Sequence, residues 1–180
     1  MNRTKNSGSQ LADKLSLWTN CDGMVVAASE KALPLATVLA KELELPLTIN
    51  YCTEIPDPSN RVKSIGSVSL NRAITHEYQH DLPQDYLAHQ VKLLQHQLRN
   101  CPTVPYPSKM ANKVVILVDS EIHTTDELLA AIEEARKNNA LEVIVAAPTI
   151  DPRIVRELFD IVDEVFYLNG TDELVPVSSN

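Results

Sequence analysis

Basic residues are scarce in this chain of 180 residues. It has 16 Lys and Arg residues against 24 Asp and Glu residues, which gives a formal net charge of -8. Nucleic acids and anionic membranes attract proteins through positive surfaces, so this balance works against both as non-specific partners. We therefore expect no nucleic acid and no membrane among the partners of the protein.

Paired cysteines and long apolar runs are also missing. Cys21, Cys52 and Cys101 are scattered and form no C-x-x-C pair, so neither a disulfide framework nor a zinc ribbon is indicated. Residues 1–10 are polar, unlike a secretory signal, and no segment approaches the roughly 18 consecutive apolar residues of a membrane-spanning helix. The pattern predicts a soluble, cytoplasmic protein in a reducing compartment.

The length and the apolar content, 44% hydrophobic residues, suit one domain with one good core. We place this domain at residues 21–170. Residues 1–20 form an N-terminal extension, in which residues 1–10 are expected to be loose and residues 11–18 to form a short helix. Residues 171–180 are expected to form a C-terminal tail.

Short apolar runs alternate with helical segments along the chain, which is typical of a parallel sheet covered on both faces. The fold class we predict is therefore α/β, with a doubly wound, mainly parallel sheet flanked by helices and a small hood or hairpin excursion. The expected strands are residues 24–28, 47–51, 113–119, 142–147 and 164–168. The expected helices are residues 33–43, 83–100, 125–138 and 152–159. The excursion covers residues 53–82, with a loop around Pro56 and Pro58 followed by a hairpin of residues 64–70 and 73–76.

The segment from Val114 to Leu129 has the layout of a phosphate site, with a strand, a tight loop and a helix N-terminus. Unpaired backbone N–H groups and the helix dipole favour an anion at such a place. In this chain the place holds Asp119, Glu121 and two further acids in the first helical turn. The framework thus suggests nucleotide or sugar-phosphate chemistry, whereas the side chains argue against it.

Three sequence motifs resemble the type I phosphoribosyltransferase family over roughly residues 22–169. The chain has D-S-E-I-H-T-T-D-E at 119–127, where the family has D-D-G-x-x-T-G-x-T. It has A-S-E-K-A-L-P-L-A at 28–36 in place of L-P-R-G-G-V-P-V-A, and P-S-N-R-V-K-S-I-G-S-V at 58–68 in place of P-G-N-P-E-x-A-I-G-A-V. The resemblance implies the fold of that family and a degenerate site for phosphoribosyl pyrophosphate.

The resemblance also implies which residues would form that site. The phosphate loop comprises Asp119, Ser120, Glu121, Ile122, His123, Thr124, Thr125, Asp126 and Glu127, and the pyrophosphate loop comprises Glu30, Lys31 and Ala32. Of the acidic pair that contacts ribose hydroxyls in the family, only Asp119 remains. Glu121 and Thr125 occupy glycine positions, where glycine permits close backbone approach and positive φ.

Electrostatics and capping both work against an anion here. A carboxylate about 4 Å from a phosphate charge costs about 1 kcal/mol in water and about 4 kcal/mol at an effective dielectric constant of about 20. Thr124 and Glu127 also have the T-x-x-E spacing of a capping box, which would satisfy the N–H donors that a phosphate needs. Thr53 and Glu54 stand where the family carries basic residues.

The first functional hypothesis is therefore a non-catalytic binding, regulatory or assembly module with no assigned catalytic residue and no cofactor. The alternative is an active phosphoribosyltransferase, or another sugar-phosphate or nucleotide enzyme of altered substrate, that uses Asp119, the Thr124 loop and Mg²⁺. If Glu30, Asp119, Glu121 and Asp126 converge, their oxygens could hold a divalent cation. The small-molecule ligand is unknown in either case.

A remote alternative is a zinc-dependent hydrolase, because His76-Glu77-Tyr78-Gln79-His80 matches H-E-x-x-H. The motif falls in an expected strand or turn and lacks an evident third ligand, so chance composition is the simpler explanation. His89 and His96 are interpreted as surface or interface histidines. Apolar stripes in residues 83–100 and 11–18 predict a possible homo-oligomer surface.

Overall fold

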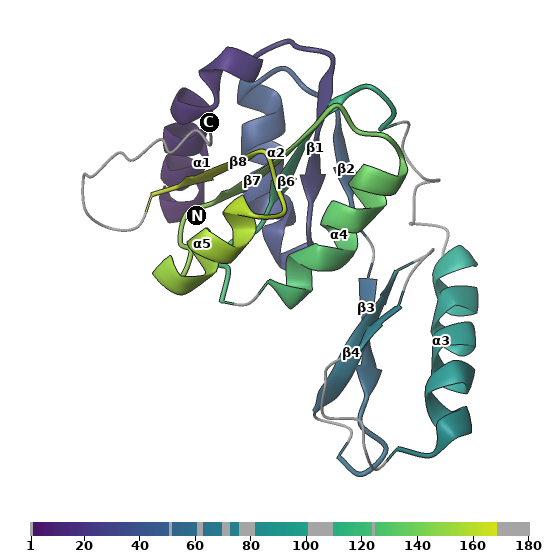
Figure 1. The fold of residues 1–180 in the computed structure, drawn as a ribbon. Coiled ribbons are helices and arrows are strands. Elements are labelled where there is room, and N and C mark those ends of the chain that lie inside the picture. The colour runs from purple at the N-terminus through teal and green to yellow at the C-terminus, as the bar shows by residue number, and fades with distance from the viewer. Residues whose placement is uncertain are drawn as a thin grey trace.

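The computed structural model describes residues 2–50, 52–60, 63–69, 73–75, 82–100, 110–123 and 125–168 (Figure 1). Its large sheet is parallel throughout and has the strand order β2-β1-β6-β7-β8. The strands are β1 (Gly23–Ala27), β2 (Leu47–Ile49), β6 (Val114–Val118), β7 (Glu142–Ala147) and β8 (Glu164–Tyr167). The predicted α/β fold class is confirmed, and each strand lies within two residues of its expected range.

Helices cover both faces of the large sheet. On one face, α1 (Asn2–Lys14) and α2 (Leu33–Glu42) pack their leucines against β1, β6 and β7. On the other face, α4 (Asp126–Lys137) and α5 (Pro152–Phe159) pack against the same strands and β8 (Figure 1). The strands β1 and β6 are buried along their whole length, which is why they appear in the sequence as continuous apolar runs.

The N-terminal helix differs from the prediction, because α1 begins at Asn2 and not at Leu11. Leu11 and Leu15 are fully buried in the core that α1 shares with α2 and the sheet. The two helices also approach closely, since a Cβ atom added to Gly8 would lie 2.6 Å from Val38 Cγ1. The apolar stripe predicted for residues 11–18 is therefore covered largely by the chain itself. This stripe offers little exposed apolar surface for the homo-oligomer contact that was predicted to involve residues 11–18.

The excursion forms a second, antiparallel sheet of order β3-β4-β5. The predicted hairpin is confirmed as β4 (Ser64–Ser69) and β5 (Ala73–Thr75). The expected loop around Pro56 is instead partly a strand, β3 (Cys52–Pro56), which pairs with β4 and has an irregularity at Ile55 and Pro56. Pro56 is tolerated because it closes the strand at this irregularity, at the edge of the sheet.

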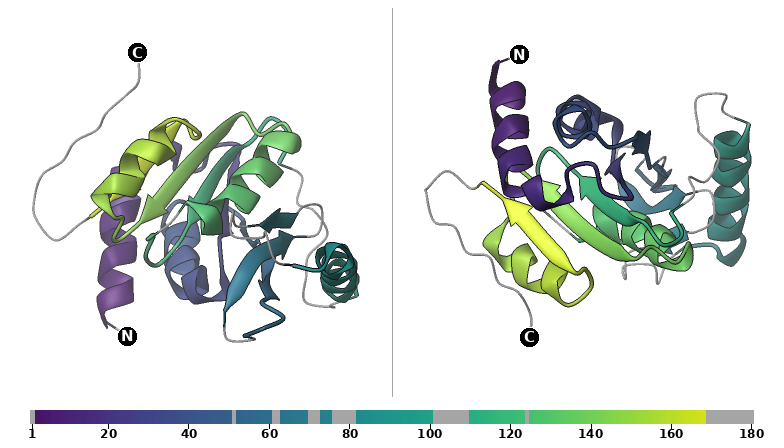
Figure 2. Two further views of the ribbon diagram at one scale, coloured as in Figure 1. Left: turned by 60° about the horizontal axis from the view of Figure 1, so that its bottom comes forward. Right: turned by 90° about the horizontal axis from the view of Figure 1, so that it is seen from above.

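Helix α3 (Gln84–Arg99) packs against β3 and β4, and the Tyr86 hydroxyl donates a hydrogen bond to the Pro56 carbonyl oxygen at 2.8 Å. Its predicted stripe, which includes Leu94 and Leu98, is half-buried. Both views of Figure 2 place α3 at the periphery of the molecule. The small sheet is joined to the main body through contacts of β4 and β5 with α4. No helix in the described ranges is both long and apolar enough to cross a membrane.

Candidate functional site

The candidate site lies at the carboxyl ends of β1 and β6, where the strand order reverses. The chain runs from β1 outward to β2 on one side, and from β6 outward to β7 and β8 on the other. Ala27 pairs with Val118, and the Ala28 N–H donates to the Val118 carbonyl oxygen at 2.8 Å. The loops that follow β1 and β6 therefore start side by side, which is the usual place for a ligand in an open α/β sheet.

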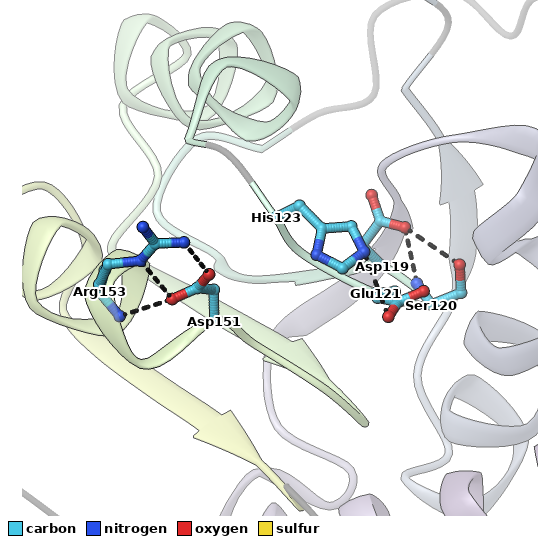
Figure 3. Close-up of polar contacts among 6 residues, drawn as sticks. All are labelled: Asp119, Ser120, Glu121, His123, Asp151 and Arg153. Atoms are coloured by element: carbon cyan, nitrogen blue, oxygen red, sulfur yellow. Dashed lines mark hydrogen bonds and ion pairs between the residues drawn. The ribbon is translucent and has the colours of Figure 1, made fainter.

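Asp119 follows β6 directly, and hydrogen bonds of its backbone and its side chain hold it in place. It is 5% exposed, and its backbone N–H donates to the Ala146 carbonyl oxygen at 3.1 Å. Its carboxylate Oδ1 accepts from the Ser120 backbone N–H at 2.6 Å and from the Ser120 hydroxyl at 3.4 Å (Figure 3). Asp119 thus stabilises the turn in which it lies, while Ser120 is exposed at the position of the second family acid.

Ile122 anchors the phosphate loop to the loop after β7. Its side chain is fully buried, its N–H donates to the Thr149 carbonyl oxygen at 3.0 Å, and its carbonyl oxygen accepts from the Asp151 N–H at 3.1 Å. It forms a parallel bridge with Ile150. The family resemblance placed Ile122 in the phosphate loop as a residue of the ligand site, and this anchoring role was not predicted. A single isoleucine in an otherwise polar loop is the feature of the sequence that indicates it.

Two short-range contacts of carboxylates lie near these loops, one from Glu121 to His123 and one from Asp151 to Arg153. His123 Nε2 lies 3.2 Å from Glu121 Oε1, and both side chains are more than half exposed. At the start of α5, the Arg153 guanidinium lies 2.7 Å from Oδ2 of Asp151, the N-cap residue of that helix (Figure 3). The Arg153 side chain, followed by its backbone N–H, lowers the pKa of Asp151 to about 2, and His123 contributes less. The His123 imidazole and the Arg153 guanidinium therefore each lie against a carboxylate.

Helix α4 begins at Asp126, one residue after its expected start at Thr125. Thr125 is the N-cap, and its carbonyl oxygen accepts from the Leu129 N–H at 2.9 Å. Its side chain makes no capping bond, and its hydroxyl donates to Glu157 Oε2 at 3.4 Å. Thr124 and the side chains of Asp126 and Glu127 lie outside the described residues, so the capping box stays a prediction.

The loop backbone does not need glycine where the family pattern has it. Thr125, at a family glycine position, has φ -76° and ψ -24°, which any residue adopts. Within the described residues, positive φ at non-glycine positions is confined to Asn20, Glu44, Asn112 and Asn139. Glu121 is not among them, so neither glycine position of this loop adopts a conformation that favours glycine.

The predicted pyrophosphate loop is a short 3-10 helix, η2 (Glu30–Ala32). Glu30 and Lys31 are exposed, whereas Ala32 is fully buried and donates its N–H to the Ser29 carbonyl oxygen at 3.1 Å. Ala32 stands where the family pattern has glycine, and its methyl group lies in the core. The acidic Glu30 stands where that pattern carries arginine, so this loop also lacks its expected anion-binding group.

Comparisons with known proteins address the fold. No family model and no curated protein matches the chain. Among solved structures, TT1426 from Thermus thermophilus is similar over 96% of this chain and 85% of its own, with 19% identity and a TM-score of 0.67. The purine phosphoribosyltransferase from Pyrococcus horikoshii is similar over 97% and 93%, with 14% identity and a TM-score of 0.56. The chain has the type I phosphoribosyltransferase fold.

A third structure with this fold, the phosphoribosylpyrophosphate synthetase of Mycobacterium smegmatis, matches over 96% of this chain and 45% of its own, with 16% identity and a TM-score of 0.54. The family resemblance inferred from the motifs is confirmed at the level of the fold. In this phosphoribosyltransferase-like fold, the loops at Glu30 and at Asp119 adjoin, as the motifs required. At these identities the activity is decided by the site residues and not by the fold.

The predicted metal ligands are only partly described. Across the described ranges, no group of three or more His, Cys, Asp and Glu side chains is placed to hold a metal ion. The side chain of Asp126 lies outside these ranges, as do all residues of the His76–His80 motif. His89 and His96 are exposed on α3, in keeping with their interpretation as surface residues.

Proposed function

We propose that this protein is a degenerate member of the phosphoribosyltransferase fold that has lost ordinary phosphoribosyl pyrophosphate binding. In this proposal it acts as a non-catalytic binding, regulatory or assembly module. The observation that carries the proposal is the position of carboxylates at the carboxyl edge. The Glu121 carboxylate lies 3.2 Å from the His123 imidazole, and the Asp151 carboxylate pairs with the Arg153 guanidinium, so a pyrophosphate at this edge would meet two carboxylates.

The expected electrostatic repulsion between a phosphate and these carboxylates supports the same conclusion. A phosphate within about 4 Å of the Glu121 carboxylate would meet a repulsion of about 1 kcal/mol in water and about 4 kcal/mol at an effective dielectric constant of about 20. Because about 1.4 kcal/mol corresponds to a tenfold change in affinity, this one contact weakens binding by roughly one to three decades. Glu30 in the adjacent loop adds a second repulsion of the same kind.

Calorimetric titration of phosphoribosyl pyrophosphate with Mg²⁺ tests the proposal. We expect no binding to the unmodified protein at micromolar concentrations. The variant Ser120→Asp/Glu121→Gly/Thr125→Gly/Glu127→Thr restores the family pattern in the loop, and we expect it to gain binding. Glu44→Gly is a matched Glu-to-Gly change remote from the loop, and it should gain none.

Two outcomes of this titration contradict the proposal. Micromolar binding by the unmodified protein would show that the loop accepts the ligand despite its acids, which would favour an enzyme. Equal gains in the restored variant and in Glu44→Gly would show that the loop side chains do not control binding. If neither variant binds, the proposal of lost binding holds, but the loop at Glu30 then suffices to prevent it.

The enzyme alternative is favoured by one observation, the carboxylate of Asp119 at the end of β6. An active phosphoribosyltransferase or related sugar-phosphate enzyme would use this group with Mg²⁺ held between protein and substrate oxygens. Its test is release of pyrophosphate from phosphoribosyl pyrophosphate across a panel of acceptor bases. Activity that Asp119→Asn removes, while the fold is retained by circular dichroism, would establish this alternative over the first proposal.

Self-association through α3 is a further proposal, because Leu93 is 41% exposed on a helix at the edge of the molecule (Figure 2). Size-exclusion chromatography with light scattering tests it. A single species at the monomer mass of 20.0 kDa would exclude it. The cytoplasmic location inferred from the cysteine pattern likewise stays a prediction, which cell fractionation would test.

A further inference from the structure

We draw no further inference here: the strongest candidate, the corner of the large sheet where the exposed Leu17 and Leu141 flank the Trp18–Glu142 hydrogen bond, carries nothing because no feature of the described chain shows what covers it.

Discussion

Truncation of Leu11 tests whether the N-terminal helix belongs to the core. Leu11 is fully buried among residues of α1, α2 and the large sheet. The side-chain carbons lost in Leu11→Ala account for about 2 kcal/mol of transfer free energy. The cavity left behind raises the total to about 2–5 kcal/mol of unfolding free energy. For a chain of this length, a loss of about 3 kcal/mol lowers Tm by about 6–12 °C.

Leu17→Ala is the matched control, because the same substitution is made six positions along the same N-terminal segment. Leu17 is 87% exposed, so we expect its truncation to change the unfolding free energy by about 0.5 kcal/mol or less. Urea unfolding followed by far-UV circular dichroism measures both values, and fluorescence of Trp18, the single tryptophan, tests whether the transition is two-state. Equal, small effects of the two variants would refute the packing of α1 in the core and favour the predicted N-terminal extension of residues 1–20 outside it.

Three further predictions concern single side chains. Glu44 has a φ of 56°, which glycine adopts more readily than glutamate, so Glu44→Gly should raise the unfolding free energy by about 1 kcal/mol in urea titrations. Asn139 has the same φ, but Asn tolerates this region, so Asn139→Gly should raise the unfolding free energy by less. Asp151→Asn should lower Tm at pH 7. The Arg153 contacts lower the pKa of Asp151 to about 2, so they stabilise the fold while Asp151 is ionised and lose this effect as the pH falls. The Tm difference between the two proteins should therefore shrink between about pH 4 and pH 2. A Tm difference that is constant with pH would contradict this. Burial raises the pKa of Glu164, and the neighbouring carboxylates raise it further, so the ionised side chain destabilises the fold at pH 7. Glu164→Gln should therefore raise Tm at pH 7 and have no effect on Tm below about pH 4, where Glu164 is protonated. Scanning calorimetry at both pH values measures this.

The sequence predicted the large sheet well because its strands are buried on both faces. Residues 142–147 and 152–159 agree with β7 and α5 to the residue. The start of α1 was missed for a physical reason, since residues 2–10 carry no apolar stripe. This part of α1 packs against α2, with Gly8 close to Val38, and such a contact between segments distant in sequence is not visible in the local pattern. Strand β3 was missed because Pro56 and its neighbours are typical of loops.

The strand register places the loops after β1 and β6 side by side, as the fold implied by the family resemblance requires, whereas the binding of a ligand there stays a prediction. The internal contacts of these loops were not predictable. The anchoring of Ile122 by Thr149 and Asp151 depends on how two loops meet after parallel strands, which no local pattern encodes. Helix α4 begins at Asp126, one residue after its expected start, which is within the one or two residues to which helix ends are assigned.

Asp119, the acid that matches the family pattern, has a structural role that needs no ligand. An aspartate that accepts a hydrogen bond from the next backbone N–H stabilises the turn at the end of a buried strand. Its hydrogen-bond donors on the exposed Ser120 can turn to water, so removing the carboxylate costs about 0.5–1.5 kcal/mol for each of these hydrogen bonds lost. Asp119 can therefore persist in a protein that binds no sugar phosphate. The exposed Glu121 has no such structural task, and under the proposed function its place at a family glycine position is the change expected to weaken ligand binding most directly.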